Sequence, residues 1–392
     1  MAKKPLKDQI AKAETQEDKR QRQHRSGGGI EAPKDTKGVF AAALAKSGHN
    51  PFHFPNIRSN ILPTGITILD SALGGGLPGG TFTMLHGDEG IGKSAFTYHL
   101  AGIVQSLGGF VWIDDPSDKF NVDLARINGM LVGPEEDPHG TAMYSQSETA
   151  EEFLANLLHW IEFSRGKQVP CLMIHDDLAV TPTKNQATAG VKKGEDYPMD
   201  VAKILSSFFR KNSEHLRHLM GSSFHCLIVN QHRAGIDFFN YGPPVPSLPG
   251  GKAVRFKLST RIKMSSQALD QKDKEKGGPL IGKQARFVVE KCCLGPEKRW
   301  ALCPYFFNFG YDDAISCLRY LIGMGHIRKG TEEGVKLKYC IEGAYHNVAE
   351  WRRLYYENQD VRNLLKEMTF RAFQADNTPK GGGEMAALSE VL

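Results

Sequence analysis

The chain has 392 residues, enough for one large α/β domain with smaller flanking pieces. Apolar residues make up 40% of it, and the formal net charge of +5 permits a nucleic-acid partner without requiring one. No apolar run approaches a membrane span, and the charged first 29 residues do not form a secretory signal. The seven cysteines show no CxxC or zinc-type spacing, so we expect reduced thiols in an intracellular protein that does not bind membranes.

The first 60 residues divide into two predicted segments. Residues 1–35 are rich in charge and contain a run of glycines, which predicts a flexible basic arm. Residues 36–60 contain the run of small residues 39–45, which predicts a short helix.

From residue 61 to 310, apolar runs typical of strands alternate with helical stretches. The runs are Phe82–Leu85, Gly109–Ile113, Cys171–Ile174, Cys226–Val229, Thr260–Met264, Ala285–Val289 and Trp300–Phe307. This alternation predicts an α/β core with a mostly parallel central sheet that helices cover on both faces. Residues 265–282 are polar, and we expect an exposed hairpin or loop there.

The pattern changes after Gly310. Tyr311–Leu321 and Val348–Phe373 are typical of helices, so residues 311–374 are predicted to form a small α-rich C-terminal domain. Residues 375–392 include three consecutive glycines and are expected to be a flexible tail.

A phosphate-binding loop follows the first predicted strand. Its sequence, Gly87-Asp88-Glu89-Gly90-Ile91-Gly92-Lys93-Ser94, matches GxxxxGK[ST] at every fixed position. Its glycines let backbone N–H groups surround a phosphate, and the next helix presents its N-terminus to the anion. We therefore expect residues 87 to 95, up to Ala95, to bind ATP, with Lys93 at the β- and γ-phosphates and Ser94 on Mg²⁺.

Acidic residues close two further predicted strands. Asp176 ends the run that begins at Cys171, where a carboxylate would hold Mg²⁺ through a water; alternatively, it and the next aspartate cap a turn. Asp114, Asp115 and Asp118 follow another strand, and each is a candidate to orient the attacking water. The sequence does not choose among these three.

The order of these motifs resembles the RecA family of DNA-strand-exchange ATPases, and within it the phage UvsX-like recombinases. The resemblance covers about Ile61 to Phe373 and is carried by the phosphate loop and by Leu62–Gly80, Val229–Arg233, Pro249–Phe256, Val289–Lys291, Phe309–Asp312 and Ala349–Met368. It implies a RecA-like P-loop ATPase core that uses ATP and Mg²⁺ and forms helical filaments in the cytoplasm or at the nucleoid. It also implies that Gln231 senses the γ-phosphate and that Lys291 reaches a neighbouring subunit's nucleotide.

The resemblance implies two DNA-binding loops as well. The first loop, near Lys184–Met199, and the helix after it carry Lys192, Lys193, Lys203, Arg210 and Lys211. The second, His232–Gly251, carries Arg233, Phe238, Phe239 and Tyr241 and leads into Gly250-Gly251-Lys252. Basic side chains neutralise DNA phosphates, loop aromatics stack on bases, and a glycine helix start can hold a phosphate. By composition alone, a solvated helix face and packed aromatics explain the same residues.

Two positions depart from the family pattern. Ser117 aligns with the family's catalytic glutamate, with Asp115 or Asp118 nearby after a one-residue shift, so slow or absent hydrolysis is expected. Cys293 stands where the family has a second cation that crosses to the next subunit, and Arg299 or Lys298 could replace it.

A short motif near the N-terminus concerns assembly. Phe40 and Ala43 match the FxxA pattern that archaeal and eukaryotic relatives dock on the neighbouring subunit. A plain amphipathic helix is the alternative.

The leading hypothesis is an ATP-dependent recombinase that forms filaments on single-stranded DNA and pairs it with a homologous duplex. Single-strand-binding and mediator proteins are further expected partners. The alternative is a RecA-fold ATPase of another class, either a recombination accessory module or a ring-forming helicase motor. The weak match at the catalytic acid argues against a fast motor.

Overall fold

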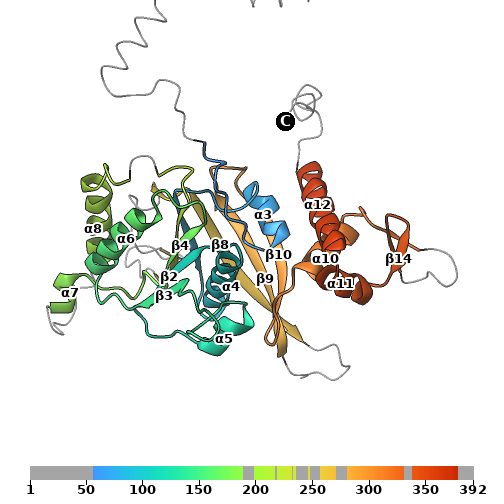
Figure 1. The fold of residues 1–392 in the computed structure, drawn as a ribbon, viewed down its shortest axis with the longest axis horizontal. Coiled ribbons are helices and arrows are strands. Elements are labelled where there is room, and N and C mark those ends of the chain that lie inside the picture. The colour runs from blue at the N-terminus through green and yellow to red at the C-terminus, as the bar shows by residue number, and fades with distance from the viewer. Residues whose placement is uncertain are drawn as a thin grey trace, which may run out of the picture. The chain divides into compact units, whose positions relative to one another are not determined.

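A nine-stranded sheet forms the centre of this computed structural model (Figure 1), which describes residues 56–188, 198–216, 219–231, 233–234, 246–247, 257–270, 280–330 and 338–377. Its strands are β1 (Thr81–Gly87), β2 (Phe110–Asp114), β3 (Ala142–Ser145), β4 (Cys171–His175), β5 (Phe224–Gln231), β8 (Thr260–Asp270), β9 (Leu280–Lys291), β10 (Trp300–Phe306) and β11 (Gly310–Tyr311). They lie in the order β11-β10-β9-β8-β1-β5-β4-β2-β3. Neighbours from β8 to β3 pair in parallel, and those from β8 to β11 pair antiparallel. The predicted mostly parallel α/β sheet is confirmed.

Helices cover both faces of this sheet. Because successive side chains of a strand point to opposite faces, strands such as β1 and β2 contribute residues to two buried clusters. Leu85 and Ile113 belong to one buried cluster, which includes residues of α3 (Thr67–Leu73), α4 (Lys93–Ser106) and α5 (Val122–Ile127). Their neighbours Met84 and Trp112 belong to the other cluster, which includes residues of α6 (Ala150–Ser164) and α8 (Pro198–Lys211). Each fully buried apolar side chain contributes about 1.5–3 kcal/mol. No helix among the described residues is long and apolar enough to cross a membrane.

Side-chain caps fix where several helices begin. Asn121 accepts a hydrogen bond from the Leu124 N–H at the start of α5, and Thr149 accepts one from the Glu152 N–H at the start of α6. Such caps satisfy backbone donors that have no partner within the helix, and each stabilises it by about 1 kcal/mol. They place the loops that precede these helices at the edge of the sheet.

The strands β8 and β9 are longer than the sequence predicts. The polar stretch expected as an exposed hairpin or loop at 265–282 continues β8 to Asp270 and begins β9 at Leu280, and residues 271–279 lie outside the described residues. Each strand satisfies the other's backbone hydrogen bonds in an antiparallel hairpin, so polar side chains do not prevent pairing. The antiparallel pairing agrees with the expected hairpin, but the strands extend beyond the predicted ends at Met264 and Ala285.

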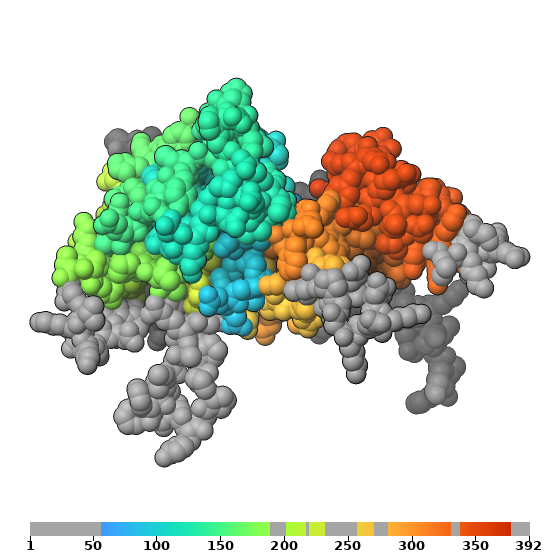
Figure 2. Space-filling view, turned by 90° about the horizontal axis from the view of Figure 1, so that it is seen from below, coloured from blue at the N-terminus to red at the C-terminus, as the bar shows by residue number. Residues whose placement is uncertain are grey.

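The C-terminal region contains α10 (Asp313–Gly323), α11 (Val348–Glu357) and α12 (Gln359–Asp376), with a small sheet of β12 (Arg328–Lys329), β13 (Tyr339–Ile341) and β14 (Ala344–His346). Figure 2 shows most of these residues, in orange-red and red, as a cluster beside the orange strands of the main sheet. The predicted helix over 348–373 is two helices, because the Asn358 side chain caps α12. The sequence missed the small sheet, since strands of two or three residues leave no periodic pattern.

Two short pieces complete the described elements. The five-residue helix α7 (Lys184–Thr188) follows β4, and β6 (Arg233–Ala234) pairs with β7 (Pro246–Ser247) within the segment after β5.

Candidate functional site

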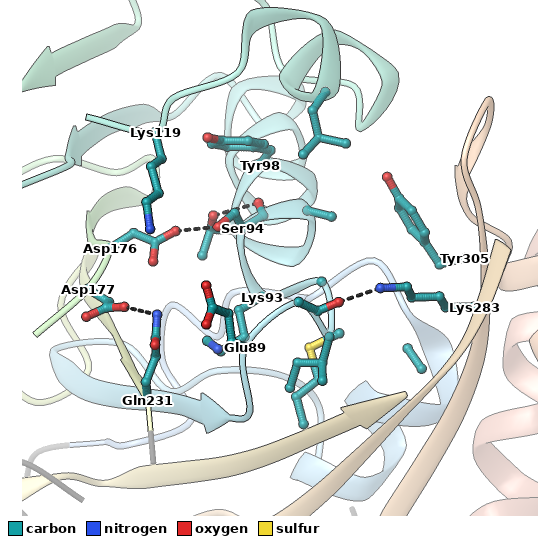
Figure 3. A pocket seen from close by; sticks show the side chains of 18 of the residues that line it. Glu89, Lys93, Ser94, Tyr98, Lys119, Asp176, Asp177, Gln231, Lys283 and Tyr305 are labelled. Atoms are coloured by element: carbon teal, nitrogen blue, oxygen red, sulfur yellow. Dashed lines mark hydrogen bonds between the residues drawn. The ribbon is translucent and has the colours of Figure 1, made fainter. Parts of the chain in front are cut away.

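A cavity of about 420 Å³ opens where β1, β2, β4 and β5 end (Figure 3). The carboxyl ends of parallel strands meet at one edge of a sheet, where ligands of open α/β folds bind. The phosphate-type loop after β1 and residues just after β2 and β4 line this cavity, together with Gln231 at the end of β5. Side chains from distant parts of the sequence therefore converge here.

The loop after β1 has the backbone conformation that its glycines permit. Gly90 has a φ of 70° and Gly92 a φ of 102°, in the left-handed region that other residues rarely adopt. Gly92 directly precedes the first helical residue of α4, Lys93, so the start of the helix faces the cavity. A Cβ atom at Gly87 would lie 2.3 Å from the Met264 carbonyl oxygen, so β1 and β8 could not keep their spacing with a larger residue.

Lys93 folds back onto its own loop. Its Nζ donates hydrogen bonds to the carbonyl oxygens of Gly87 (3.0 Å) and Asp88 (2.7 Å), and its side chain is buried. Burial lowers the pKa of Lys93, while the carboxylates of Asp177 and Asp176 oppose that shift. A phosphate entering the loop would offer this ammonium a charged acceptor in place of neutral carbonyls.

Ser94 and Asp176 form a pair of oxygen ligands suited to Mg²⁺. The Ser94 hydroxyl donates a 2.8 Å hydrogen bond to Oδ2 of Asp176. Burial, together with the neighbouring carboxylates Asp177 and Asp115, raises the pKa of Asp176 to about 6, although the hydrogen bond from Ser94 opposes this shift. A divalent cation would relieve this concentration of negative charge. Among the described residues no group of three or more His, Cys, Asp or Glu side chains is arranged to hold a metal, and Mg²⁺ bound with phosphates needs only one or two protein ligands.

Gln231 and Asp177 form a second polar pair in the cavity. Gln231 is paired with Gly87 in the parallel register of β5 and β1, and its amide donates a hydrogen bond to Oδ2 of Asp177. The other oxygen of Asp177 accepts from the N–H groups of Ala179 (2.7 Å) and Val180 (3.1 Å). Asp177 therefore caps the turn after β4 and also holds Gln231. The sequence suggested only the cap, because the partner lies 54 residues away.

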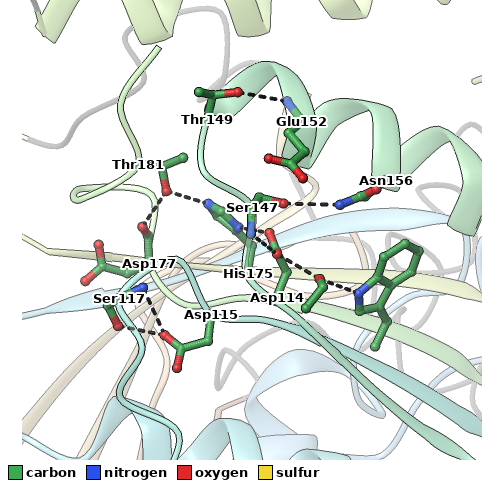
Figure 4. Close-up of polar contacts among 12 residues, drawn as sticks. Asp114, Asp115, Ser117, Ser147, Thr149, Glu152, Asn156, His175, Asp177 and Thr181 are labelled. Atoms are coloured by element: carbon green, nitrogen blue, oxygen red, sulfur yellow. Dashed lines mark hydrogen bonds and ion pairs between the residues drawn. The ribbon is translucent and has the colours of Figure 1, made fainter. Parts of the chain in front are cut away.

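The three candidate acids after β2 have different surroundings, and Figure 4 shows those of Asp114 and Asp115. Asp115 lines the cavity, but Oδ1 accepts from the Ser117 hydroxyl (2.7 Å) and Oδ2 from the Lys119 N–H (2.7 Å). Asp118, with a φ of 52°, does not line the cavity and accepts a 2.6 Å hydrogen bond from Gln146. The carboxylate of Asp115 therefore holds the loop itself, and that of Asp118 connects the loop to Gln146, which follows β3.

Asp114 does not line the cavity and forms a buried hydrogen bond with His175. Its Oδ2 is 2.8 Å from Nδ1 of His175, and neither side chain is exposed. Burial opposes ionisation of Asp114, but hydrogen bonds from His175 and Ser147 hold its pKa below the usual value. Nε2 of His175 contacts the Thr181 hydroxyl at 3.0 Å, which links this pair to the turn after β4. Asp114 is thus separated from the cavity and serves packing between β2 and β4.

Aromatic side chains also line the cavity, which the sequence did not indicate. Tyr98 on α4, Tyr305 and Phe307 line it, and burial raises the pKa of Tyr98 to about 12, so this phenol stays neutral. Lys283 on β9 reaches the same cavity and donates a hydrogen bond to the carbonyl of Gly90. These residues come from α4 and the antiparallel edge, and only the folded sheet brings them together.

The candidates for a contact between subunits lie outside this cavity. Lys291 donates a 2.6 Å hydrogen bond to the Leu258 carbonyl and does not line the cavity. Cys293 is exposed, and the Arg299 guanidinium lies 5.7 Å from the centre of the Phe373 ring. Lys291 therefore does not reach the cavity that the loop after β1 lines.

The candidate DNA-binding residues are only partly described. On α8, Lys203, Arg210 and Lys211 are exposed, whereas Leu205 and Phe208 are buried against the sheet. Arg233 belongs to β6, opposite Ser247 of β7. The remaining candidates lie outside the described residues: Lys192, Lys193, Phe238, Phe239, Tyr241, Gly250, Gly251 and Lys252, together with the interface candidates Phe40 and Ala43.

Comparison with known proteins identifies relatives along most of the chain. Residues 48–311 match the family model of the RecA N-terminal domain. The chain is 28% identical over 312 residues to Protein RecA of Chlorobaculum tepidum, covering 78% of this chain and 82% of that protein. It is 30% identical over 318 residues to Protein RecA of Solidesulfovibrio magneticus, covering 80% and 79%. It is also 30% identical over 311 residues to Protein RecA of Nitratidesulfovibrio vulgaris, covering 78% and 77%.

Proposed function

The chain belongs to the RecA family, and on that premise we propose that it is an ATP-dependent recombinase of the UvsX-like type. It would form helical filaments on single-stranded DNA and pair that strand with a homologous duplex. The observation that carries the proposal is the gathering of Lys93, the Ser94–Asp176 pair and Gln231 around one cavity. We take residues 61–310 as the ATPase core and 311–374 as the C-terminal domain.

The loop residues 87–95 would hold the phosphates. Lys93 would exchange its carbonyl partners for the β- and γ-phosphate oxygens, while backbone N–H groups at the start of α4 face the same anion. Ser94 and Asp176 would hold Mg²⁺, Asp176 through a water, and Mg²⁺ when bound would neutralise charge on the β- and γ-phosphates. The aromatic side chains that line the cavity, Tyr98 and Tyr305, would contact the base and ribose.

Gln231 would couple the presence of the terminal phosphate to the conformation of the proposed DNA-binding segment. Its amide has Asp177 as a partner, and a γ-phosphate oxygen would compete for that donor. Because Gln231 is the last residue of β5, a change in its side chain acts at the start of 232–251, the proposed second DNA loop. A ligand shifts a segment between two conformations only if it binds one of them more tightly. Here the γ-phosphate would provide this difference through its contact with Gln231.

Slow hydrolysis is part of the proposal. Asp115 is favoured over Asp118 as the acid that orients water, because Asp115 lines the cavity. Both oxygens of Asp115 already accept hydrogen bonds within the loop, so it would be a poorly placed base. Such a site would hold ATP long enough for a filament to grow.

DNA would be bound by the two loops and by α8. The exposed Lys203, Arg210 and Lys211 on α8 support this, since they present positive charge on one surface of the helix. Lys291 would contact the nucleotide bound by the neighbouring subunit, and Phe40 and Ala43 would dock on that subunit. Mediator and single-strand-binding proteins are proposed partners.

The test is electron microscopy of the purified protein with ATP, Mg²⁺ and single-stranded DNA, followed by a strand-exchange assay. Helical filaments that require both nucleotide and DNA, together with exchanged product, are expected. Closed rings with rapid hydrolysis would replace the recombinase with a motor. Monomers that ignore DNA would contradict both functions and leave only the nucleotide site.

A further inference from the structure

A lysine outside the phosphate loop enters the nucleotide cavity. Three lysines line this cavity, and two of them, Lys93 and Lys283, donate hydrogen bonds to carbonyls of the loop. The third, Lys119, is exposed, and its ammonium forms no hydrogen bond or ion pair with the described residues. Figure 3 shows this ammonium pointing toward Asp176.

The acidic loop after β2 is built so that Lys119 reaches this position. Asp115 fixes the backbone at both ends of the turn, through the Ser117 N–H at 3.1 Å and the Lys119 N–H at 2.7 Å. Asp118 is held to the side by Gln146. The carboxylates of this loop thus shape it, and its lysine reaches the same cavity that Asp115 lines.

The position of Lys119 corresponds to the terminal-phosphate end of the cavity. Ser94 and Asp176 are the residues that would hold Mg²⁺ beside the terminal phosphates, and Gln231 lies beside Asp177 on the same side of the cavity (Figure 3). Tyr305 lies on the other side of the cavity. A triphosphate that places its base near Tyr305 would extend its γ-phosphate toward Lys119.

We propose that Lys119 binds the terminal phosphate of the triphosphate from within the same subunit. This inference rests on the proposed ATP site. It gives the site a cation of its own, in a chain where Cys293 replaces one of the two cations expected from the neighbouring subunit. Lys119 would therefore distinguish a triphosphate from a diphosphate before any neighbour is present.

The ordinary alternative is a solvated lysine that faces acids without touching nucleotide. The two explanations differ in which nucleotide is affected. A lysine that acts only through the general field of the cavity changes the affinity for diphosphate and triphosphate together. A lysine that contacts the terminal phosphate changes the affinity for triphosphate alone, and its contribution falls with salt because the side chain is exposed.

The experiment is calorimetric titration of the full chain with Mg²⁺ and either ADP or the non-hydrolysable β,γ-imido analogue of ATP, without DNA. Lys119→Ala should weaken binding of the analogue about tenfold, as expected for one charge-assisted phosphate contact, and change ADP binding less than about twofold. Lys119→Arg should retain most of the preference for the analogue. Lys329→Ala, an exposed lysine on β12 outside the cavity, is the matched control and should bind as wild type.

The outcomes separate this inference from the proposed function. Equal losses for both nucleotides in Lys119→Ala, or no loss for either while Lys93→Ala binds poorly, would overturn the role of Lys119 and leave the ATP site intact. Wild-type protein that binds neither nucleotide would overturn the ATP site and this role with it. A loss confined to the analogue, rescued by arginine and reduced at high salt, supports the proposal.

Discussion

Two loops at the same edge of the sheet differ in how they use polar groups. The loop between β1 and α4 leaves backbone N–H groups and the Lys93 ammonium facing the cavity, held only by neutral carbonyls. The loop after β2 uses the carboxylates of Asp115 and Asp118 to hold its own backbone and Gln146. One loop therefore leaves donors facing the cavity, as the proposed phosphate binding requires, whereas the other uses its carboxylates to hold its own structure. An acidic residue at the end of a strand is not by itself evidence of a base.

The largest effect is expected in the phosphate loop. Lys93→Ala removes a buried ammonium that no other group replaces, so affinity for ATP with Mg²⁺ should fall at least about 100-fold, as measured by calorimetry. Lys283→Ala is the control, since this lysine touches the loop only through the Gly90 carbonyl and should cost less than about tenfold. Wild-type affinity in Lys93→Ala would contradict the assignment of the loop.

The metal pair should give the next largest effect. Asp176→Asn keeps the size of the side chain but removes the negative charge beside Ser94. Affinity for ATP should fall about 10–100-fold in Mg²⁺ and remain unchanged in excess chelator, because the loss lies in metal binding. An equal loss with and without Mg²⁺ would show that the substitution damages the loop instead.

Asp115→Asn tests the contrast between the two loops directly. If Asp115 holds the loop, weakened hydrogen bonds should reduce ATP affinity and hydrolysis together, by about tenfold, with a loss of about 1–2 kcal/mol in unfolding free energy. If it is the base, kcat should fall at least 100-fold while affinity stays unchanged. Binding titrations and single-turnover hydrolysis on the same variant separate these results.

Glu290 on β9, which contacts His86 of the strand that leads into the phosphate loop, gives a pH-dependent prediction. Burial opposes ionisation of Glu290, but His86 (2.9 Å) and Arg261 (2.7 Å) hold its pKa below the usual value. A carboxylate whose pKa is lowered by folding stabilises the protein above its unfolded pKa of about 4.5, and this contribution is lost as the pH falls further. Glu290→Gln should therefore cost about 1 kcal/mol at pH 7 and progressively less below pH 4.5, in chemical denaturation. A constant difference across this range would refute the pairing.

Asp118 should show the smallest effect. Its φ of 52° favours glycine, while its hydrogen bond to Gln146 favours the aspartate. Asp118→Gly should change stability by no more than about 0.5 kcal/mol and hydrolysis by less than about twofold. A large loss of hydrolysis with unchanged stability would make Asp118 the catalytic acid and reverse the comparison.

The sequence predicted those parts that depend on contiguous residues. The fixed spacing of the phosphate loop and the apolar runs of β1, β2, β4 and β5 are local signals, and the strands were confirmed. The alternate burial of Met84 and Leu85 in two clusters explains why these runs read as continuously apolar. The fold class followed from that alternation of strands and helices.

Other features depend on contacts between distant residues. The partner of Asp177 lies in another strand, and the direction of the Lys119 side chain depends on the turn that Asp115 ties. The true ends of β8 and β9 depend on their pairing. No periodicity encodes these features, so the sequence alone pointed to three acids after β2 and missed the lysine among them.

The most direct test of the central claim is steady-state ATP hydrolysis with and without saturating single-stranded DNA, with Lys93→Ala as the blank. The account predicts slow hydrolysis that DNA stimulates and that Lys93→Ala abolishes, because Gln231 joins the phosphate site to the proposed DNA segment. Hydrolysis that is unchanged by DNA, or that survives in Lys93→Ala, would contradict a DNA-coupled nucleotide site at this edge of the sheet.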